Sequence, residues 1–508
     1  GVNVRKTTAR LLQRGYAAHH VNFDIDSNSP TSNPMYPPIS PDLPTSDNRE
    51  CFGTLVLCES IQNTEPLIAI NQAFDRLPIH GDLLIMDEFA LRHDATETTP
   101  PFFLDNMITL AERLGFKLIE QINLSDLAAP TLAYWRRAIQ THRQKLHAEH
   151  AVTDEQWIQF DRFYQHRQLQ FSKALCGYVY LHFKKLSAPK WRVQLLHFNQ
   201  MPDMLALFKK TFHHDMTPAV WQWKYGTHTG RAIGVWRDHN LIAHYGGIGR
   251  RILFFGESQT AVQIGDVMVD VAERGTLSKK GPFFLATATF LEHYIGYGKP
   301  YLLGFGFPSE RHMKIAEHLG QYARVGNLIE FSWSPRFRYP HWRTKLQLID
   351  DATSDANKAI VNSCWQYMLA DMQSAIIGVR DWEYVQRRYL QHPSQPYQVL
   401  MIKNRLSHQV KGILVLRYDA ADCEIMDFIA PLRSIPLIIH HARRLASLHG
   451  CTRVFCHITE NFADHFAKTG GTGQPAHIPI PANIWSPGPT PETLKNHWWL
   501  MSGDKDFR

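Results

Sequence analysis

The sequence predicts an α/β domain followed by two related α+β domains. The length of 508 residues allows about three domains of roughly 150 residues each. Apolar segments of strand length alternate with helical segments in the first part of the chain, and a pattern of roughly 100 residues recurs in the rest. The hydrophobic share of 44% supplies side chains for several cores and excludes a disordered or fibrous protein.

Three apolar strands define the first domain, at residues 53–58, 82–87 and 116–121. Helices are expected between them at 67–77 and 101–114, and this alternation is typical of a parallel sheet covered on both faces. Residues 28–48 contain six prolines and are expected as a loop, because proline interrupts helices and central strands. The domain is expected to close with two helices and a strand, at residues 134–147, 157–173 and 177–184.

A weak internal repeat defines the second and third domains. A helical segment and two strands, at 221–226, 233–236 and 241–246, recur at 381–389, 397–402 and 412–417. Repeats of this length are domain duplications. The expected domains are therefore residues 1–186, 193–335 and 346–508, with a linker around Pro335 and Pro340. Trp382, Trp498 and Trp499 are expected as apolar anchors between the last two domains.

Charge and cysteine content exclude several classes of protein. The formal net charge is only +7 and no run of five basic residues occurs, so nucleic-acid binding is not expected. The seven cysteines form no CxxC pair, which indicates a reducing, cytoplasmic compartment and no structural metal site. No apolar run approaches the roughly 18 residues of a membrane span, and no signal peptide is visible.

Four segments of the first domain carry a recognisable order: Gly1–Val4, Val21–Asp26, Phe52–Ser60 and His80–Asp87. In this order they resemble class I S-adenosylmethionine-dependent methyltransferases, and the resemblance covers residues 1 to about 185. No GxGxG turn follows a strand in residues 1–60, so the turn that holds the methionine part of the cofactor is missing. The chain is therefore expected to be a methyltransferase truncated at its amino end.

The methyltransferase resemblance implies a set of residues that bind S-adenosyl-L-methionine. Asn3 would bind the ribose hydroxyls, and Asp26, or Ser27 if the alignment shifts by one residue, would contact the adenine amine. Glu59 and Ser60, with Asn63 nearby, follow a strand at the carboxyl edge where ligands of open α/β sheets bind. Methyl transfer depends on positioning, so no catalytic base is assigned. Another doubly wound protein is the alternative for this domain.

In the second domain, two strands at 241–247 and 262–269 are followed by a basic turn, 274–281, that opens a helix at Pro282. This arrangement resembles the acyl-CoA-binding core of GNAT-type N-acyltransferases. The resemblance implies that the pyrophosphate of acetyl-CoA or another acyl-CoA binds at this helix N-terminus. The residues implied in cofactor binding are Arg274, Lys279, Lys280 and Gly281, with Ser309 starting the helix after a splayed strand.

Departures from the GNAT pattern leave the catalytic residues open. The glycine turn has a different spacing, and Ala316 occupies the position where the family often has a tyrosine that acts as general acid. Glu317, His318 and Tyr322 are candidate substitutes, and His244 is a candidate base near pH 7. A lone histidine among 28 is more often a core or solvated residue. The third domain has no basic glycine turn and is expected as a degenerate copy.

The combined expectation is a two-activity transferase that modifies one small-molecule or carrier-bound metabolite. The methyl acceptor and the acyl acceptor cannot be read from the sequence. The alternative is a non-catalytic scaffold or carrier-binding protein in which both cofactor sites have decayed.

Overall fold

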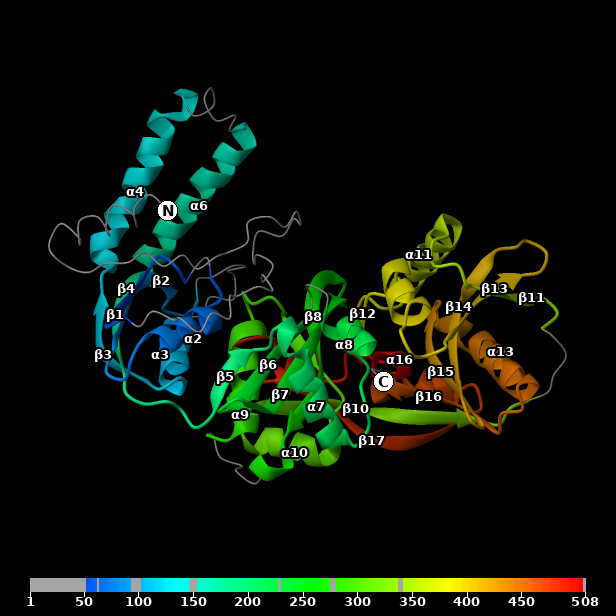
Figure 1. The fold of residues 1–508 in the computed structure, drawn as a ribbon. Helices are drawn as coiled ribbons and strands as arrows, with labels where there is room; N and C mark the ends of the chain where they lie inside the picture. Colours follow the sequence, from blue (N-terminus) through cyan, green and yellow to red (C-terminus); the bar gives the residue numbers. More distant parts are fainter. Residues whose placement is uncertain are drawn as a thin grey trace.

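The computed structural model describes residues 52–61, 64–92, 102–145, 153–226, 230–274, 280–336 and 341–505. Asn3, Asp26, Ser27, Asn63 and Lys279 therefore lie outside the described residues. The described parts form three adjoining bodies that follow one another along the sequence (Figure 1). No described helix is both long and apolar enough to span a membrane.

The first body is built on a four-stranded mixed sheet with the order β1-β2-β4-β3. The strands are β1 (Thr54–Cys58), β2 (Asp82–Ala90), β3 (Phe116–Asn123) and β4 (Cys176–Lys185). β1 and β2 are parallel, as the sequence predicts, whereas β4 runs antiparallel between β2 and β3. The helices α2 (Pro66–Arg76) and α3 (Leu104–Arg113) pack their apolar sides against the sheet.

The reversal of β4 follows from the connection that precedes it. Two helices, α4 (Ser125–Thr141) and α6 (Asp154–Ser172), separate β3 from β4. They form a hairpin that projects away from the sheet (Figure 1). A single crossover helix returns the chain to the end where the strand began, but a helical hairpin returns it to the end where the strand stopped. The expectation of an all-parallel sheet is therefore wrong for this strand.

The second body contains an antiparallel sheet flanked by helices. Its strands are β5 (Arg192–Leu195), β6 (Gly230–Arg237), β7 (Asn240–Phe254) and β8 (Glu257–Val269), and the short β9 (Leu303–Phe305) pairs in parallel with β8. A Cβ on Gly246 would meet Tyr225 of α8, whereas a Cβ on Gly247 would meet Phe290 of α9. Different helices therefore cover the two faces of the sheet. One face is covered by α7 (Met201–Phe212) and α8 (Pro218–Tyr225), and the other face is covered by α9 (Pro282–Tyr294).

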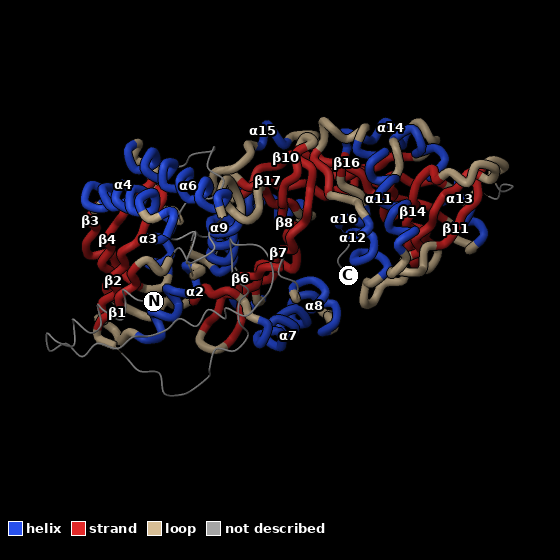
Figure 2. Tube along the Cα trace, turned by 90° about the horizontal axis from the view of Figure 1, so that it is seen from above, coloured by secondary structure: helices blue, strands red, loops and turns tan. Residues whose placement is uncertain are grey.

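The third body is a seven-stranded sheet with the order β11-β13-β14-β15-β16-β10-β17. The helices α11 and α13 cover it, and short helices and turns connect the remaining strands (Figure 2). The bounds of these elements are α10 (Glu310–His318), β10 (Tyr322–Trp333), β11 (Thr344–Leu348), α11 (Asp355–Leu369), β12 (Ile376–Gly378), α12 (Trp382–Val385), β13 (Gln398–Asn404), β14 (Val410–Asp419), β15 (Asp422–Ile429), α13 (Ile435–Leu448), β16 (Arg453–Thr459), α14 (Ala463–Ala467), β17 (Thr472–Asn483), α15 (Pro491–Leu494), β18 (Trp498–Trp499) and α16 (Ser502–Lys505).

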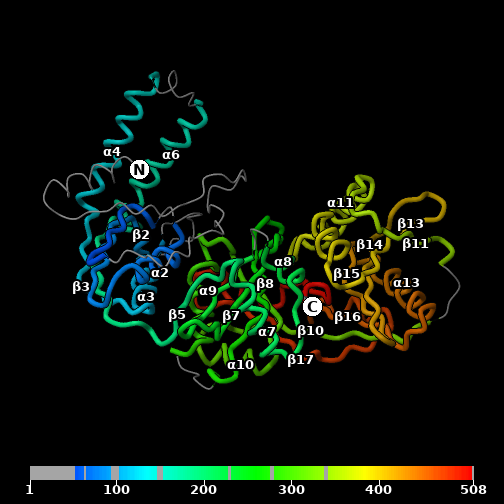
Figure 3. Tube along the Cα trace, viewed as in Figure 1, coloured from blue at the N-terminus to red at the C-terminus, as the bar shows by residue number. Residues whose placement is uncertain are grey.

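The second and third bodies exchange strands. β10 lies in the expected second domain (193–335) but pairs with β16 and β17 in the sheet of the third body. Conversely, β12 and β18 lie in the expected third domain (346–508) and extend the sheet of the second body beside β7. Figure 3 shows the red end of the chain returning to the green body. The expected domain boundaries at 335 and 346 stay a prediction, but a strand from each side of these boundaries completes the sheet of the other body. Trp498 and Trp499, expected as apolar anchors, are 2% and 0% exposed.

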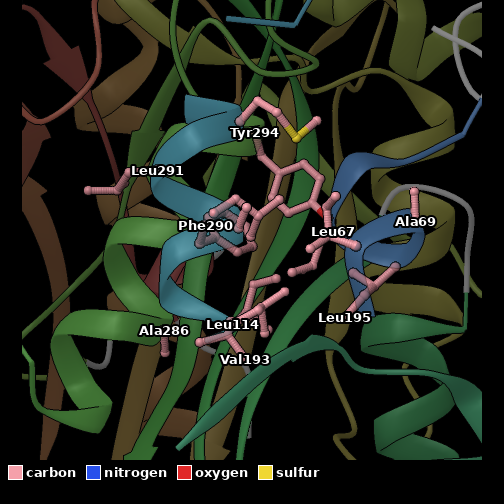
Figure 4. Packing of buried hydrophobic residues seen from close by; sticks show 14 of the residues in the cluster. Leu67, Ala69, Leu114, Val193, Leu195, Ala286, Phe290, Leu291 and Tyr294 are labelled. Atoms are coloured by element: carbon pink, nitrogen blue, oxygen red, sulfur yellow. The ribbon is translucent and has the colours of Figure 1, made fainter. Parts of the chain in front are cut away.

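The first body shares one apolar core with the second. Leu67 and Leu114 of the first body pack with Val193, Phe290 and Tyr294 of the second (Figure 4). α9 lies between the two bodies, and nearly all of its residues are buried, which explains why most of them are apolar. Ion pairs between Arg113 and Glu292, at 2.5 Å, and between Arg192 and Asp75, at 2.6 Å, link the same surfaces.

Candidate active site

β8 and β9 pair only briefly before their paths separate. Three residues of each strand are paired, from Ala261 with Leu303 to Gln263 with Phe305. Beyond this point β8 continues to Val269, while the chain after β9 enters α10 through Pro308. In the part of the chain that the structure describes, the β9 side of β8 beyond Gln263 has no strand partner. Its outward-facing backbone groups are therefore available to a ligand inserted beside this strand.

A β-bulge at Asp266 interrupts β8 next to this opening. Gly246 of β7 pairs with Gly265 of β8, and His244 pairs with Met268, so the register of the two strands shifts between these pairs. Asp266 lies at this shift and has a φ of 50°. A non-glycine residue in the left-handed region carries backbone strain and persists only where the surroundings hold it. The carboxylate of Asp266 accepts hydrogen bonds from Tyr225, at 2.7 Å, and from Lys224, at 3.0 Å. These contacts from α8 fix the bulge.

His244 lies on β7 beside the bulge, with a relative exposure of 1%. Its Nδ1 atom donates a hydrogen bond to the backbone oxygen of Asp266 at 2.7 Å, which leaves Nε2 as the acceptor nitrogen. Nε2 is buried and has no hydrogen-bond partner among the described residues. Burial lowers the pKa of His244, an effect that the contact with Asp266 opposes and the charge of Lys224 reinforces. The imidazole is therefore neutral at pH 7 and can accept a proton.

The N-terminus of α9 follows β8 and faces a group of basic side chains. Gly281 is the N-cap and Pro282 is the first helical residue, so the next amides have no carbonyl acceptor inside the helix. Lys280 directly precedes the cap and is exposed. Arg274 folds back so that its Nε donates to the carbonyl of Val269 at 2.9 Å. The site is thus cationic where the sequence predicts anion binding.

Ser309 joins this group of basic residues through α10. Its hydroxyl caps the helix by accepting from the amide of His312, and it lies 2.9 Å from Nδ1 of the same residue. Burial, together with the charges of Arg311 and Arg274, lowers the pKa of His312. The charge of Arg274 thus acts on His312, the residue that Ser309 contacts in the first turn of α10.

Other predicted site residues lie elsewhere. Glu317 and His318 are exposed at the carboxyl end of α10, about two turns from Ser309. Tyr322 is buried on β10, and its hydroxyl bonds to that of Tyr245, which packs against Phe290 of α9, on the face of β7 opposite to His244. None of the three therefore adjoins His244.

Glu59 and Ser60 lie at the end of β1, in the first body. The amide of Glu59 donates to the carbonyl of Met86, and Glu59 has a φ of 50°. The hydroxyl of Ser60 donates to the carbonyl of Cys58 at 3.0 Å. The two residues are thus at the carboxyl edge of the sheet, but their implied cofactor contacts also require residues outside the described part.

Three residues of the site were not singled out from the sequence: Lys224, Tyr225 and Asp266. Asp266 bonds to Lys224 and Tyr225 across 42 and 41 residues of sequence, a separation at which sequence patterns give no pairing information. One signal was present, because Gly265-Asp266 interrupts an otherwise apolar strand, and such an interruption is typical of a bulge.

Comparison with known proteins identifies the class of this domain. Residues 192–313 match the family model described as an acetyltransferase (GNAT) domain, which covers β5 to the middle of α10. The chain therefore contains a GNAT acetyltransferase domain. No curated protein matches the sequence significantly. None of these matches supports a methyltransferase, which stays a prediction for residues 1–186.

Several solved structures match part of this chain at low sequence identity. A conserved protein of unknown function from Enterococcus faecalis, described as a probable N-acyltransferase, is 13% identical over 58% of this chain and 72% of its own, with a TM-score of 0.45. A GCN5-related N-acetyltransferase from Anabaena variabilis is 10% identical over 58% and 73%, with a TM-score of 0.44. The N-myristoyltransferase of Saccharomyces cerevisiae, solved with myristoyl-CoA, is 9% identical over 58% and 79%, with a TM-score of 0.39.

Proposed function

We propose that this protein is an acyl-CoA-dependent N-acyltransferase whose active site lies where β8 and β9 separate. The observation that carries the proposal is the buried, neutral His244 with an unpartnered Nε2 beside the Asp266 bulge, within the matched GNAT domain. The N-terminus of α9 and the basic residues Arg274 and Lys280 would hold the pyrophosphate, because free helix amides and positive charge both favour an anion there.

The residues of the site fit amide formation. Acyl-CoA supplies an acyl group activated as a thioester, which an amine converts to an amide with release of CoA. Nε2 of His244 takes the proton that the attacking nitrogen loses as its bond to carbon forms. The imidazolium then gives this proton to the sulfur that leaves. Asp266 holds the histidine tautomer through its backbone oxygen, and Lys224 and Tyr225 hold Asp266.

A direct assay tests this proposal with the whole chain. Acetyl-CoA is expected to bind in a calorimetric titration, and CoA thiol release is expected to accelerate when primary amines are added. Myristoyl-CoA serves as a second donor, which reports the acyl length that the site accepts. The proposal would fail if neither donor bound at millimolar concentration.

Replacing Lys280 with alanine should weaken acetyl-CoA binding roughly ten- to a hundredfold, since a charge-assisted contact contributes about 1.5 to 3 kcal/mol. The melting temperature should change little because Lys280 is exposed. Titration of the variant measures the affinity, and Lys495→Ala, at an exposed position beside α15, is the matched control. Equal affinity in the two variants would place the pyrophosphate elsewhere.

For residues 1–186 we propose a methyltransferase-like fold. The support is the topology: β1, β2 and β3 run in one direction, and the reversed β4 lies next to the edge strand β3, as in the closing strands of class I methyltransferase sheets. The absence of a glycine-rich turn in residues 1–60 removes backbone donors that would hold the methionine part. S-adenosylmethionine should therefore bind the 508-residue chain more weakly than micromolar, and calorimetry showing micromolar affinity would prove this expectation wrong.

A further inference from the structure

The outer end of the third body carries a basic surface that the proposed chemistry of His244 does not use. β11 and the hairpin that joins β13 to β14 lie at the end of the molecule farthest from the first body, whereas β8 lies near the middle (Figure 1). β11 is the edge strand of the seven-stranded sheet and pairs antiparallel with β13. This surface is therefore separate from the opening beside β8.

Four basic side chains share one face of the two-stranded ribbon that β11 and β13 form. Lys345 of β11 lies directly opposite Lys403 of β13. The amide of Arg405 donates to the backbone oxygen of Arg343 at 2.8 Å, which continues the same register by two residues. Alternate residues of a strand point to one side, so all four side chains lie on one face. Lys411 lies next to them, where the register of β14 shifts opposite Lys403.

No carboxylate in the part of the chain that the structure describes forms an ion pair with these five side chains. Asp and Glu are absent from residues 341–349, 398–418 and 431–459, which include β11, the β13–β14 hairpin, α13 and β16. Ion pairs with an acidic strand begin only further into the sheet, where Arg417 of β14 pairs with Glu424 of β15. The nearer Lys411 donates to the neutral Gln409 at 2.7 Å.

This uncompensated charge opposes the pairing of the two strands. Like charges directly opposite each other in an antiparallel pair destabilise it, and Lys345 and Lys403 occupy such positions. An anionic partner removes this repulsion, because it replaces the missing carboxylates. The row of basic side chains therefore favours a partner with several negative charges.

Two apolar side chains protrude at the end of the same ribbon. Trp342 precedes β11 and is 71% exposed, and Leu406 lies in the β13–β14 turn and is 91% exposed. They are the next pair in the register after Arg343 and Arg405, so they lie side by side at the tip. The guanidinium of Arg343 lies 4.1 Å from the ring centre of Trp342. The tip thus combines exposed apolar surface with adjacent positive charge.

Hydrogen bonds fix the turn that presents Leu406. The side-chain oxygen of Asn404 accepts from the amides of Leu406, at 2.9 Å, and Ser407, at 3.0 Å. Nε of Arg405 donates to the backbone oxygen of His341 at 3.3 Å, which ties the turn to the chain that enters β11. Because the backbone is held before a partner arrives, less conformational entropy is lost on binding.

We propose that this tip docks onto a lipid bilayer that contains anionic phospholipids. Trp342 and Leu406 enter the boundary between headgroups and acyl chains, and the row of basic side chains contacts lipid phosphates. An indole suits this boundary because it has an apolar body and a polar N–H group. None of these residues takes part in the proposed acyl transfer, so the two proposals stand separately.

A nucleic acid or an acidic protein would match only part of this surface. A nucleic-acid backbone neutralises the basic row, but it offers no apolar environment to a leucine at the end of a hairpin. A stable protein interface buries roughly 800 Å² on each partner, far more than two side chains at a hairpin tip supply. Binding to a bilayer needs only buried apolar area together with attraction to anionic lipids. The lipid surface accounts for both features.

Co-sedimentation of the whole chain with lipid vesicles tests this assignment. One set of vesicles contains phosphatidylcholine alone, and the other contains equal parts of phosphatidylcholine and phosphatidylglycerol. The anionic vesicles should bind at least roughly tenfold more tightly, since each Lys or Arg near an anionic surface strengthens binding roughly fivefold. Added sodium chloride should weaken this binding. Equal affinity for both vesicles, or binding to neither, would overturn the proposal.

Replacing Leu406 with serine tests the apolar part of the surface. Leu406→Ser should weaken binding to the anionic vesicles roughly tenfold, because the leucine no longer leaves water on binding. Leu127→Ser is the matched control, since Leu127 is 78% exposed in the first body. Equal affinities of the two variants would show that the tip does not enter the bilayer, and the proposal would fail.

Two charge variants with opposite effects keep the test independent of folding. Lys345→Gln should weaken binding to the anionic vesicles roughly fivefold, and Gln347→Lys should strengthen it by a similar factor. Gln347 is exposed and lies on the same face of β11 as Lys345. Lys117→Gln, at an exposed position of β3, is the control. No change, or a change in the same direction, in the first two variants would contradict the proposal.

A short DNA duplex added as a competitor distinguishes lipid from nucleic acid. The duplex should displace the vesicles only weakly, because it binds the basic row without the apolar tip. If the duplex displaces the vesicles completely and Leu406→Ser has no effect on vesicle affinity, the surface binds nucleic-acid phosphates and the lipid proposal is wrong.

Discussion

Replacing Arg380 with methionine should lower the free energy of unfolding by about 3 to 5 kcal/mol, because it leaves buried carboxylates without their partner. Arg380 is fully buried, donates to Asp427 at 2.9 Å and to Asp504 at 2.5 Å, and thereby joins β15 to α16. Burial already raises the pKa of Asp427, and the charge of Arg380 opposes this rise. Urea denaturation measures the loss.

The exposed Arg251 provides the matched control for Arg380. Its side chain is 53% exposed and pairs with Asp381 and Glu383, so Arg251→Met should cost no more than about 1 kcal/mol. The double variant Arg380→Met, Asp427→Leu should recover part of the stability, because it removes one of the stranded carboxylates. Equal losses for Arg380→Met and Arg251→Met would show that the buried network does not stabilise the fold.

Replacing His244 with glutamine should reduce the acyl-transfer rate by about 10² to 10⁴-fold, the usual contribution of a general base. The affinity for acetyl-CoA should remain, since His244 is not among the basic residues at the N-terminus of α9. His318→Gln is the control, because His318 is exposed at the far end of α10. An equal loss in His318→Gln or Glu317→Gln would move the base to α10.

The pH profile provides an independent check of the same residue. Only neutral His244 accepts a proton, and burial lowers its pKa below the ordinary value of 6.5. The rate constant kcat/KM, calculated for the unprotonated amine, should therefore stay level as the pH falls through 6.5 and should decline only at lower pH. A decline centred on or above the ordinary histidine value would show that another group is the base.

The strands of the first body were predictable because each is a short apolar run. The segments 53–58, 82–87 and 116–121 agree with β1, β2 and β3 within a few residues. The direction of β4 was not predictable from its own residues, because it depends on the two-helix connection before it. The exchange of strands between the two sheets could not be predicted either. Ile376 pairs with Phe254 and with Trp498, and an apolar run does not indicate which distant strand it pairs with.

The candidate site was predictable only in its local parts. Gly281 and Pro282 mark a helix start, and the structure places α9 there. His244 could be named as a possible base but not distinguished from other histidines, because what distinguishes it is its place beside the Asp266 bulge. A cavity between β7 and α12 is lined by residues near Arg250 and near Arg387, which are far apart in the sequence, so no local pattern revealed it.

The strand exchange also restricts the order in which a growing chain can fold. β7 leaves the ribosome early, but β12, which pairs with Ile252–Phe254 of β7, and β18, which pairs with β12, are made more than 100 residues later, as is Asp504, the ion-pair partner of Arg250. Until then this edge presents unpaired amides and carbonyls that another chain could join. The sheet that contains β7 therefore cannot reach its final form during synthesis before β12 and β18 have emerged.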